Sequence, residues 1–134
     1  MDRKLRDEVW LRARATCEYC QMPQEFAEPT HEMDHVIAEK HSGPTSMENL
    51  ALACFHCNNH KGPNIAGLDP ATQALTRLFD PRKDHWSEHF YWSGPVLVGK
   101  TAVARTTIVV LNVNMRHRVI HRESLIDEGV FPPL

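Results

Sequence analysis

Two Cys-x-x-Cys pairs constrain this chain more than any other feature of its sequence. The first pair is Cys17 and Cys20, the second is Cys54 and Cys57, and thirty-three residues separate them. A Cys-x-x-Cys turn can direct both sulfur atoms at one ion, and four thiolates suit the tetrahedral coordination of structural zinc. Unrelated core cysteines or a redox pair are the alternatives, but the paired spacing and the absence of a thioredoxin-like βαβ pattern disfavour both. The sequence therefore predicts one structural Zn²⁺ bound by four cysteines.

Length and charge limit the fold and its partners. With 134 residues the chain fits one domain, small enough to gain stability from a bound metal. A net charge of −2 gives no global attraction to a polyanion, so any nucleic-acid partner must be held locally. The charged N-terminus and the lack of a long apolar run predict a cytoplasmic protein with no membrane partner. In that reducing compartment cysteines serve more often as metal ligands than as disulfides.

The apolar pattern predicts short elements around the cysteines. Leu5, Val9, Trp10 and Ala13 recur at helical spacing, which indicates an amphipathic N-terminal helix that ends near the first pair. Residues 31–37 partly alternate between apolar and polar, and "LALAC" follows after a loop rich in glycine, proline and small polar residues. We therefore expect two short strands between the cysteine pairs.

The C-terminal half predicts a mostly helical extension. In "DPATQALTRLFD", Asp69 is placed as a helix N-cap, Pro70 as the first helical residue and Pro81 as the stop. The aromatic segment "HWSEHFYW" is expected to be extended. Residues 103–111 carry a helical apolar stripe whose β-branched content also allows a strand, and we favour the helix.

Basic and aromatic residues of this half have two possible roles. The aromatic residues of 86–92 either pack over the rest of the domain, which we favour, or stack on bases. Four arginines form the densest basic group after the N-terminus and either contact phosphates or face water: Arg105, Arg116, Arg118 and Arg122.

Polar residues between and just after the cysteine pairs form a candidate catalytic set. Asp34 and His35 are adjacent, Asn49 opens the second expected strand, Asn58 directly follows Cys57, and Lys61 comes three residues later. Each has a structural alternative: a buried histidine bonded to the aspartate, a loop cap, a helix-start residue, and a charge at a helix C-terminus. His41, His56 and His60 are interpreted as surface or outer residues.

In this order the residues resemble the HNH endonuclease family, in its zinc-bearing variant with a Cys-x-x-Cys knuckle on each side. The resemblance covers about Cys17 to Gly62 and rests on "MDHV", "ENLALAC" and "CFHCNNHK". It implies a ββα-metal, or His-Me, finger in which Asp34 and Asn58 bind a catalytic divalent metal, His35 is the general base, and Asn49 fixes the loop and orients the base. Lys61 is the candidate substrate-binding residue.

The chemistry of these residue types suits phosphodiester hydrolysis. Neutral imidazole can take a proton from water near pH 7. A hard cation such as Mg²⁺ or Mn²⁺, held by few protein oxygens, keeps coordination positions for phosphate and water.

We therefore expect a single α+β domain over residues 1–134, with an HNH core at about 10–65 and an extension at about 66–134. The predicted activity is metal-dependent nicking or cutting of DNA by a one-metal mechanism. The alternative is a non-catalytic zinc-binding module for nucleic-acid or protein interaction.

Overall fold

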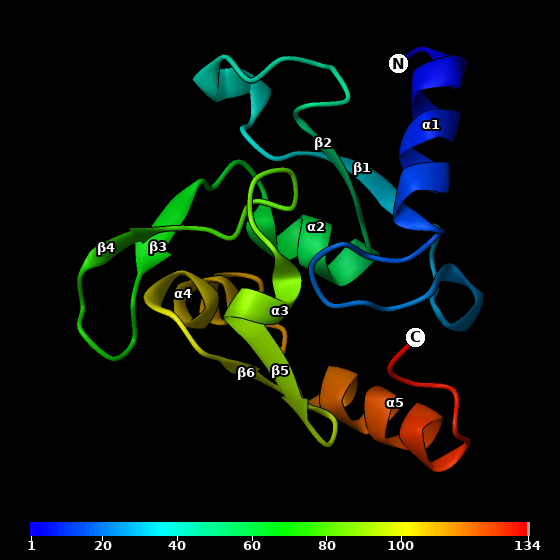
Figure 1. The fold of residues 1–134 in the computed structure, drawn as a ribbon, viewed down its shortest axis with the longest axis vertical. Coiled ribbons are helices and arrows are strands. Elements are labelled where there is room, and N and C mark those ends of the chain that lie inside the picture. The colour runs from blue at the N-terminus through cyan, green and yellow to red at the C-terminus, as the bar shows by residue number, and fades with distance from the viewer. Residues whose placement is uncertain (134) are drawn as a thin grey trace.

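The computed structural model describes residues 1–133. Within this range the elements follow in the order α1 (Arg3–Ala13), β1 (Glu32–His35), β2 (Leu50–Ala53), α2 (Phe55–Lys61), β3 (Ala66–Leu68), β4 (Leu75–Arg77), α3 (Trp86–His89), β5 (Phe90–Ser93), β6 (Val96–Gly99), α4 (Ala102–Val110) and α5 (Arg116–Asp127) (Figure 1). Three antiparallel hairpins form, β1–β2, β3–β4 and β5–β6, and each is a separate two-stranded sheet. The mixture of helices and small antiparallel sheets confirms the predicted α+β class.

The N-terminal helix α1 forms where the apolar spacing predicts it. Asp2 caps the helix by accepting a hydrogen bond from the backbone N–H of Lys4 at 3.2 Å. Val9 is fully buried and packs with Leu50 and Leu52 of β2. The helix therefore anchors the hairpin from one side and ends shortly before the first cysteine pair.

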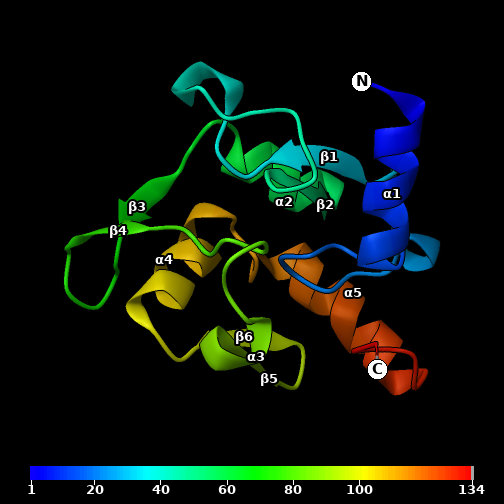
Figure 2. The same ribbon diagram turned by 45° about the horizontal axis from the view of Figure 1, so that its top comes forward.

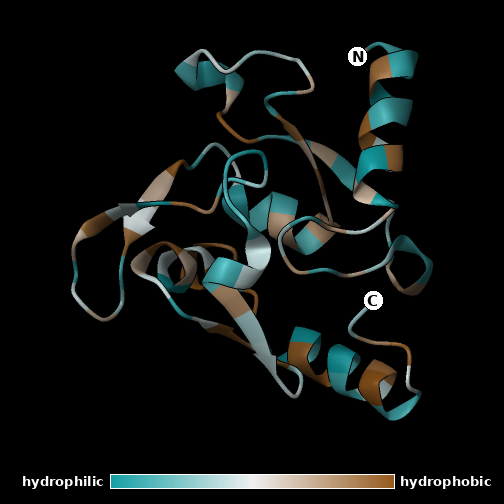
Figure 3. Ribbon diagram, in the orientation of Figure 1, coloured by the Kyte–Doolittle hydropathy of each residue, from teal (hydrophilic) through white to brown (hydrophobic). Residues whose placement is uncertain are grey.

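The hairpin β1–β2 and the helix α2 form the predicted ββα unit. In the hairpin, Asp34 lies opposite Ala51 and His35 lies opposite Leu50. Every residue of β2 is buried, because its leucines face α1 while its alanines pack in the cluster that contains the cysteines. The brown colouring along β2 in Figure 3 shows this apolar character. Helix α2 follows at once, with Cys54 as its N-cap.

The helix predicted from Asp69 to Asp80 is wrong, because the structure has a turn and then strand β4 in this segment, and β4 pairs with the preceding strand β3. The Asp69 carboxylate accepts hydrogen bonds from the backbone N–H of Ala71 and the hydroxyl of Thr72, both at 3.0 Å. Arg105 of α4 donates two further bonds to the same carboxylate. An Asp-Pro pair starts turns as well as helices, and here the side chain of Asp69 closes a turn.

The rest of the extension consists of α3, the hairpin β5–β6 and the two longer helices α4 and α5. Residues 103–111 are largely helical as favoured, whereas the expected extended segment begins with the short helix α3 and becomes strand β5 only at Phe90. Trp86 and Phe79 each lie 5.1 Å from Phe90 between ring centroids, so these aromatic rings pack in the core, as favoured from the sequence. None of the helices within residues 1–133 combines the length and the apolar character needed to cross a bilayer.

Helix α5 closes the structure on the far side of α2. Figures 1 and 2 both show α2 between the β1–β2 hairpin and α5. Its buried residues include Arg118, Arg122 and Leu125, so one face of this helix is directed at the core despite its many charges.

Candidate functional site

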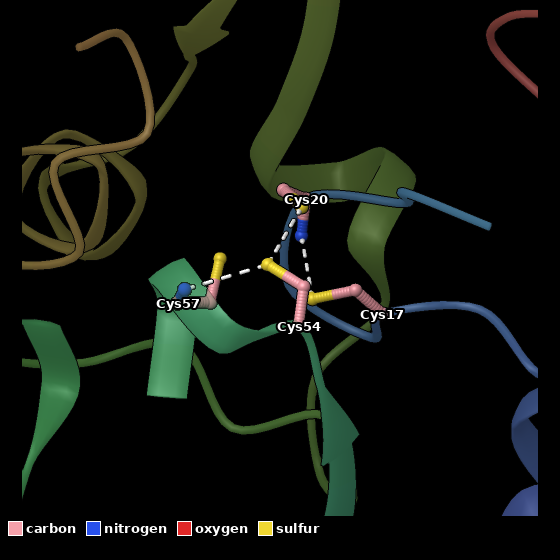
Figure 4. Close-up of side chains that lie close together, drawn as sticks. All are labelled: Cys17, Cys20, Cys54 and Cys57. Carbon is pink, nitrogen blue, oxygen red and sulfur yellow. Dashed lines mark hydrogen bonds between the residues drawn. The ribbon is translucent and has the colours of Figure 1, made fainter. Parts of the chain in front are cut away.

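The four cysteines converge on one point, as the paired spacing predicts (Figure 4). Their sulfur atoms all lie within 4.8 Å of one another, and all four side chains are buried and free of disulfides. The Sγ atoms of Cys20 and Cys54 are 3.7 Å apart. Zn–S bonds of about 2.3 Å in a tetrahedron place sulfurs about 3.8 Å apart. The cluster therefore fits a structural zinc ion.

Backbone N–H groups support each knuckle in the same way. The N–H of Cys20 points to Cys17 Sγ at 3.5 Å, and the N–H of Cys57 points to Cys54 Sγ at 3.4 Å. Burial raises the pKa of the Cys17 thiol and the Cys57 thiol, whereas hydrogen bonds from neighbouring thiols lower the pKa of Cys20. Binding of Zn²⁺ supplies the positive charge that favours the thiolate form of all four ligands.

Arg118 adds a positive charge to this cluster from α5. Its Nη2 atom lies 3.0 Å from Cys57 Sγ and 3.8 Å from Cys54 Sγ. Its Nη1 atom donates to the backbone carbonyls of Leu111 and Asn112. Burial alone lowers the pKa of the Arg118 guanidinium, but the sulfurs of Cys57 and its neighbours more than offset this and raise it.

The fold therefore separates the four arginines of the C-terminal basic group. Arg118 and Arg122 are buried, and Arg122 donates to the carbonyls of Pro95 and Val113, so neither faces phosphate or water as expected. Arg105 pairs with Asp69, and Arg116 remains exposed. The contact of Arg118 with the sulfurs could not be predicted from sequence, because Arg118 lies sixty-one positions after Cys57.

Asp34 lies at the junction between the first knuckle, β1 and α2. Its Oδ2 atom accepts a hydrogen bond from the Tyr19 hydroxyl at 2.5 Å, and its Oδ1 atom accepts one from Lys61 Nζ at 3.2 Å. The side chain is only 4% exposed. Burial raises the pKa of Asp34, although the charge of Lys61 and the hydrogen bond from Tyr19 partly counteract this.

Lys61 occupies a position different from the one expected. The predicted contact with substrate needs an accessible ammonium group, yet Lys61 is 1% exposed. Its Nζ atom donates to Asp34 Oδ1 and to the backbone carbonyls of His35 and Val36, at 3.1 to 3.2 Å. Because all three donors have partners inside the protein, Lys61 ties the end of β1 to the end of α2 rather than reaching outward.

His35 is half-buried where β1 meets the loop of residues 36–49. Its Nε2 atom lies 2.8 Å from the hydroxyl of Thr45 and 3.8 Å from the carboxylate of Glu39. Both partners come from the loop, so the loop conformation sets the orientation of the imidazole ring. Sequence reasoning missed Thr45, because a threonine in a polar loop carries no distinctive signal.

Asn49 holds this loop closed. Its side-chain oxygen accepts from the N–H of Ile37 at 2.9 Å, and its amide nitrogen donates to the carbonyls of Ile37 and Pro44. Gly43 is needed where the loop passes close to the backbone of Ile37, since a Cβ atom there would lie 1.7 Å from the carbonyl oxygen of Ile37. The loop that carries Thr45 and Glu39 is therefore fixed against β1.

Asn58 lies at the same β1–α2 contact as Asp34, but the two side chains are not bonded to each other. Its Nδ2 atom donates to Glu32 Oε2 at 2.5 Å, while Lys61, one turn further along α2, contacts Asp34. Donation by Nδ2 leaves the amide oxygen of Asn58 available as a ligand. One carboxylate and one amide oxygen are the hard donors that Mg²⁺ prefers, although Asp34 already has partners on both oxygens.

The hairpin and the following helix form a ββα finger, and the four-cysteine cluster beside them fits a structural zinc ion. In agreement, residues 17–64 match the family model described as HNH endonuclease, which confirms the predicted resemblance for this segment. The chain is also similar to the Septu protein PtuB of Bacillus thuringiensis, with 26% identity over 113 residues. That similarity covers 82% of this chain but only 41% of the relative, so the chain spans about two fifths of its length. No solved structure shows a significant match.

Proposed function

We propose that the protein is a metal-dependent endonuclease that hydrolyses DNA phosphodiester bonds, by nicking or cutting, with His35 as general base. The observation that carries this proposal is the Asp34–His35 dipeptide at the end of a hairpin strand, held against α2 inside a segment that matches the HNH endonuclease family. The four cysteines are buried in the same core cluster as the alanines of β2, and a four-thiolate cluster fits a structural role rather than a catalytic one.

His35 has the surroundings that a general base needs. Thr45 restricts the ring through the contact with Nε2, and the loop that supplies Thr45 is held by Asn49. A fixed neutral imidazole can accept the proton of an attacking water near neutral pH. Asn49 therefore acts on the base through the loop, as a positioning residue.

Asp34 and Asn58 are the proposed ligands of one catalytic Mg²⁺ or Mn²⁺. When bound, such an ion supplies positive charge for the developing charge on the phosphoryl oxygens. The chain contributes few protein oxygens to it, so exchange with solvent should be fast. Glu32 fixes the orientation of the Asn58 amide, and Lys61 and Tyr19 fix that of the Asp34 carboxylate.

DNA is the proposed partner, and the charge distribution restricts how it is bound. Because the net charge is −2, affinity must come from local contacts rather than from the whole surface. The four free thiols also favour a reducing compartment, so we propose a cytoplasmic location.

A second function is favoured by one specific observation. The Asp34 carboxylate is already paired with Lys61 and Tyr19, and a paired, buried carboxylate is typical of structural sites. The alternative is therefore a non-catalytic zinc-binding module that binds nucleic acid or protein.

Cleavage of supercoiled plasmid DNA with Mg²⁺ or Mn²⁺ tests the proposal. The wild-type protein should nick or linearise the plasmid, and the His35→Ala variant should lose about 10²- to 10⁴-fold in rate. The matched control is His60→Ala, on α2 and outside the contacts of the site. An inactive wild-type protein that still binds DNA or a protein would support the alternative, and an active His35→Ala variant would refute the role of His35.

A further inference from the structure

We infer that Tyr19 is a positioning residue that couples the zinc knuckle to the candidate nuclease site. Tyr19 lies between the two cysteines of the first knuckle, Cys17 and Cys20, and its hydroxyl donates to Asp34 Oδ2. The same short turn thus supplies two zinc ligands and one hydrogen bond to the proposed metal ligand. The inference rests on the proposed function, because it assigns Tyr19 a role through Asp34.

The backbone of Tyr19 is held firmly in place. Its carbonyl accepts a hydrogen bond from Trp86 Nε1 at 2.8 Å. The preceding residue, Glu18, is fixed to β2, since its N–H donates to the carbonyl of Leu52 and its carboxylate accepts from the N–H of Leu52, both at 2.8 Å. The ring also packs edge-on against Phe79. A rigid turn transmits any displacement of the knuckle to the hydroxyl group.

The hydroxyl of Tyr19 determines the orientation of one carboxylate oxygen. Lys61 holds Oδ1 of Asp34, and Tyr19 holds Oδ2. Without the hydroxyl, the carboxylate keeps a single side-chain partner and can rotate about its Cα–Cβ and Cβ–Cγ bonds. Residues that orient metal ligands by hydrogen bonding typically change metal affinity or activity about 10- to 100-fold when they are removed.

The packing of the ring and the hydrogen bond of the hydroxyl can be separated. Tyr19 is 2% exposed, and phenylalanine fills nearly the same volume in the same cluster. A buried hydroxyl needs a hydrogen-bond partner, and here the partner is the carboxylate of the candidate site. Tyr19→Phe therefore removes the proposed coupling while the contacts of the ring remain.

The test compares Tyr19→Phe with the wild-type protein and with Tyr91→Phe, a control on β5 whose side chain is 48% exposed. Zinc per chain is measured by elemental analysis, Mn²⁺ affinity by electron paramagnetic resonance, and plasmid cleavage as a function of Mn²⁺ concentration. We expect Tyr19→Phe to retain zinc, to bind Mn²⁺ about 10- to 100-fold more weakly, and to regain part of its cleavage rate at high Mn²⁺. Tyr91→Phe should match the wild type in all three measurements.

The outcomes separate this inference from the proposed function. A Tyr19→Phe variant with wild-type Mn²⁺ affinity overturns the inference and leaves the proposed function standing. Loss of zinc or of folded protein in that variant also overturns it, because the hydroxyl would then support the knuckle itself. If the wild-type protein neither binds Mn²⁺ nor cleaves DNA, the proposed function fails and the role of Tyr19 in it fails as well.

Discussion

Replacement of Arg118 tests whether the C-terminal helix contributes to zinc binding. In Arg118→Met the side chain keeps much of its apolar volume but loses its charge and all its donors. The variant removes the contact at 3.0 Å with Cys57 Sγ and the two bonds from Nη1 to backbone carbonyls. Four thiolates and one Zn²⁺ carry a net charge of about −2, so a buried guanidinium at this distance stabilises the occupied site.

The size of the effect follows from the type of contact. A hydrogen bond to a charged group contributes about 1.5–3 kcal/mol. Since about 1.4 kcal/mol corresponds to a tenfold change in an equilibrium constant, Arg118→Met should weaken zinc binding about 10- to 100-fold. Arg118→Lys keeps the charge but cannot reach the sulfurs and both carbonyls together, so its loss should be smaller.

Competition with a chromogenic zinc chelator measures this affinity directly. The matched control is Arg116→Met, which removes an exposed arginine from the first turn of the same helix. Circular dichroism at each chelator concentration shows whether zinc loss and unfolding coincide. A zinc affinity of Arg118→Met equal to that of Arg116→Met would refute the reasoning.

Three further predictions concern the loop, the buried charge and the two metals. Asn49→Asp turns the donor to the Ile37 and Pro44 carbonyls into an acceptor, so the loop should become sensitive to limited proteolysis and cleavage should fall; an unchanged digestion pattern would contradict this. Lys61→Met leaves Asp34 buried without its cation and should lower the free energy of unfolding by about 3–5 kcal/mol, measured in urea with excess zinc; a loss below about 1 kcal/mol would count against the ion pair. Mild EDTA should abolish cleavage and added Mg²⁺ or Mn²⁺ should restore it while elemental analysis still finds zinc, because thiolate binding is coupled to folding. Full cleavage in excess EDTA would rule out the one-metal mechanism.

The elements that the sequence predicts correctly are those with local signals. The helix before Cys17 and the two strands follow from apolar spacing, whereas α2 was implied only by the resemblance to the HNH family. The cysteines could be assigned to one cluster because their spacing is characteristic. The prediction of a helix after Asp69 was wrong because the same Asp-Pro signal starts both helices and turns. Arg105, thirty-six positions further along the chain, binds the Asp69 carboxylate and favours the turn.

The contacts that set the geometry of the candidate site were not predictable for a different reason. Tyr19, Thr45 and Arg118 act through partners that are distant in the sequence or in irregular loops, and no periodicity identifies such pairs. The direction of the Lys61 side chain was likewise not predictable from the sequence. Its place near the end of a helix suggested an exposed charge, whereas the fold directs its ammonium group at the carbonyls of His35 and Val36, where β1 ends.

The contacts of the first knuckle indicate that the finger and the extension fold as one unit, which we propose for residues 1–133; residue 134 of the expected domain lies outside the described residues. Each residue from 18 to 21 except Cys20 is held by a side chain of the extension. Arg82 pairs with Glu18, Trp86 donates to the carbonyl of Tyr19, and Trp92 donates to the side chain of Gln21. Arg118 does the same for the second knuckle at Cys57. A finger without its extension would lose all of these contacts around the four cysteines and around Tyr19, which donates to Asp34. The geometry of the candidate site therefore depends on residues outside 17–64, the segment that matches the HNH endonuclease model.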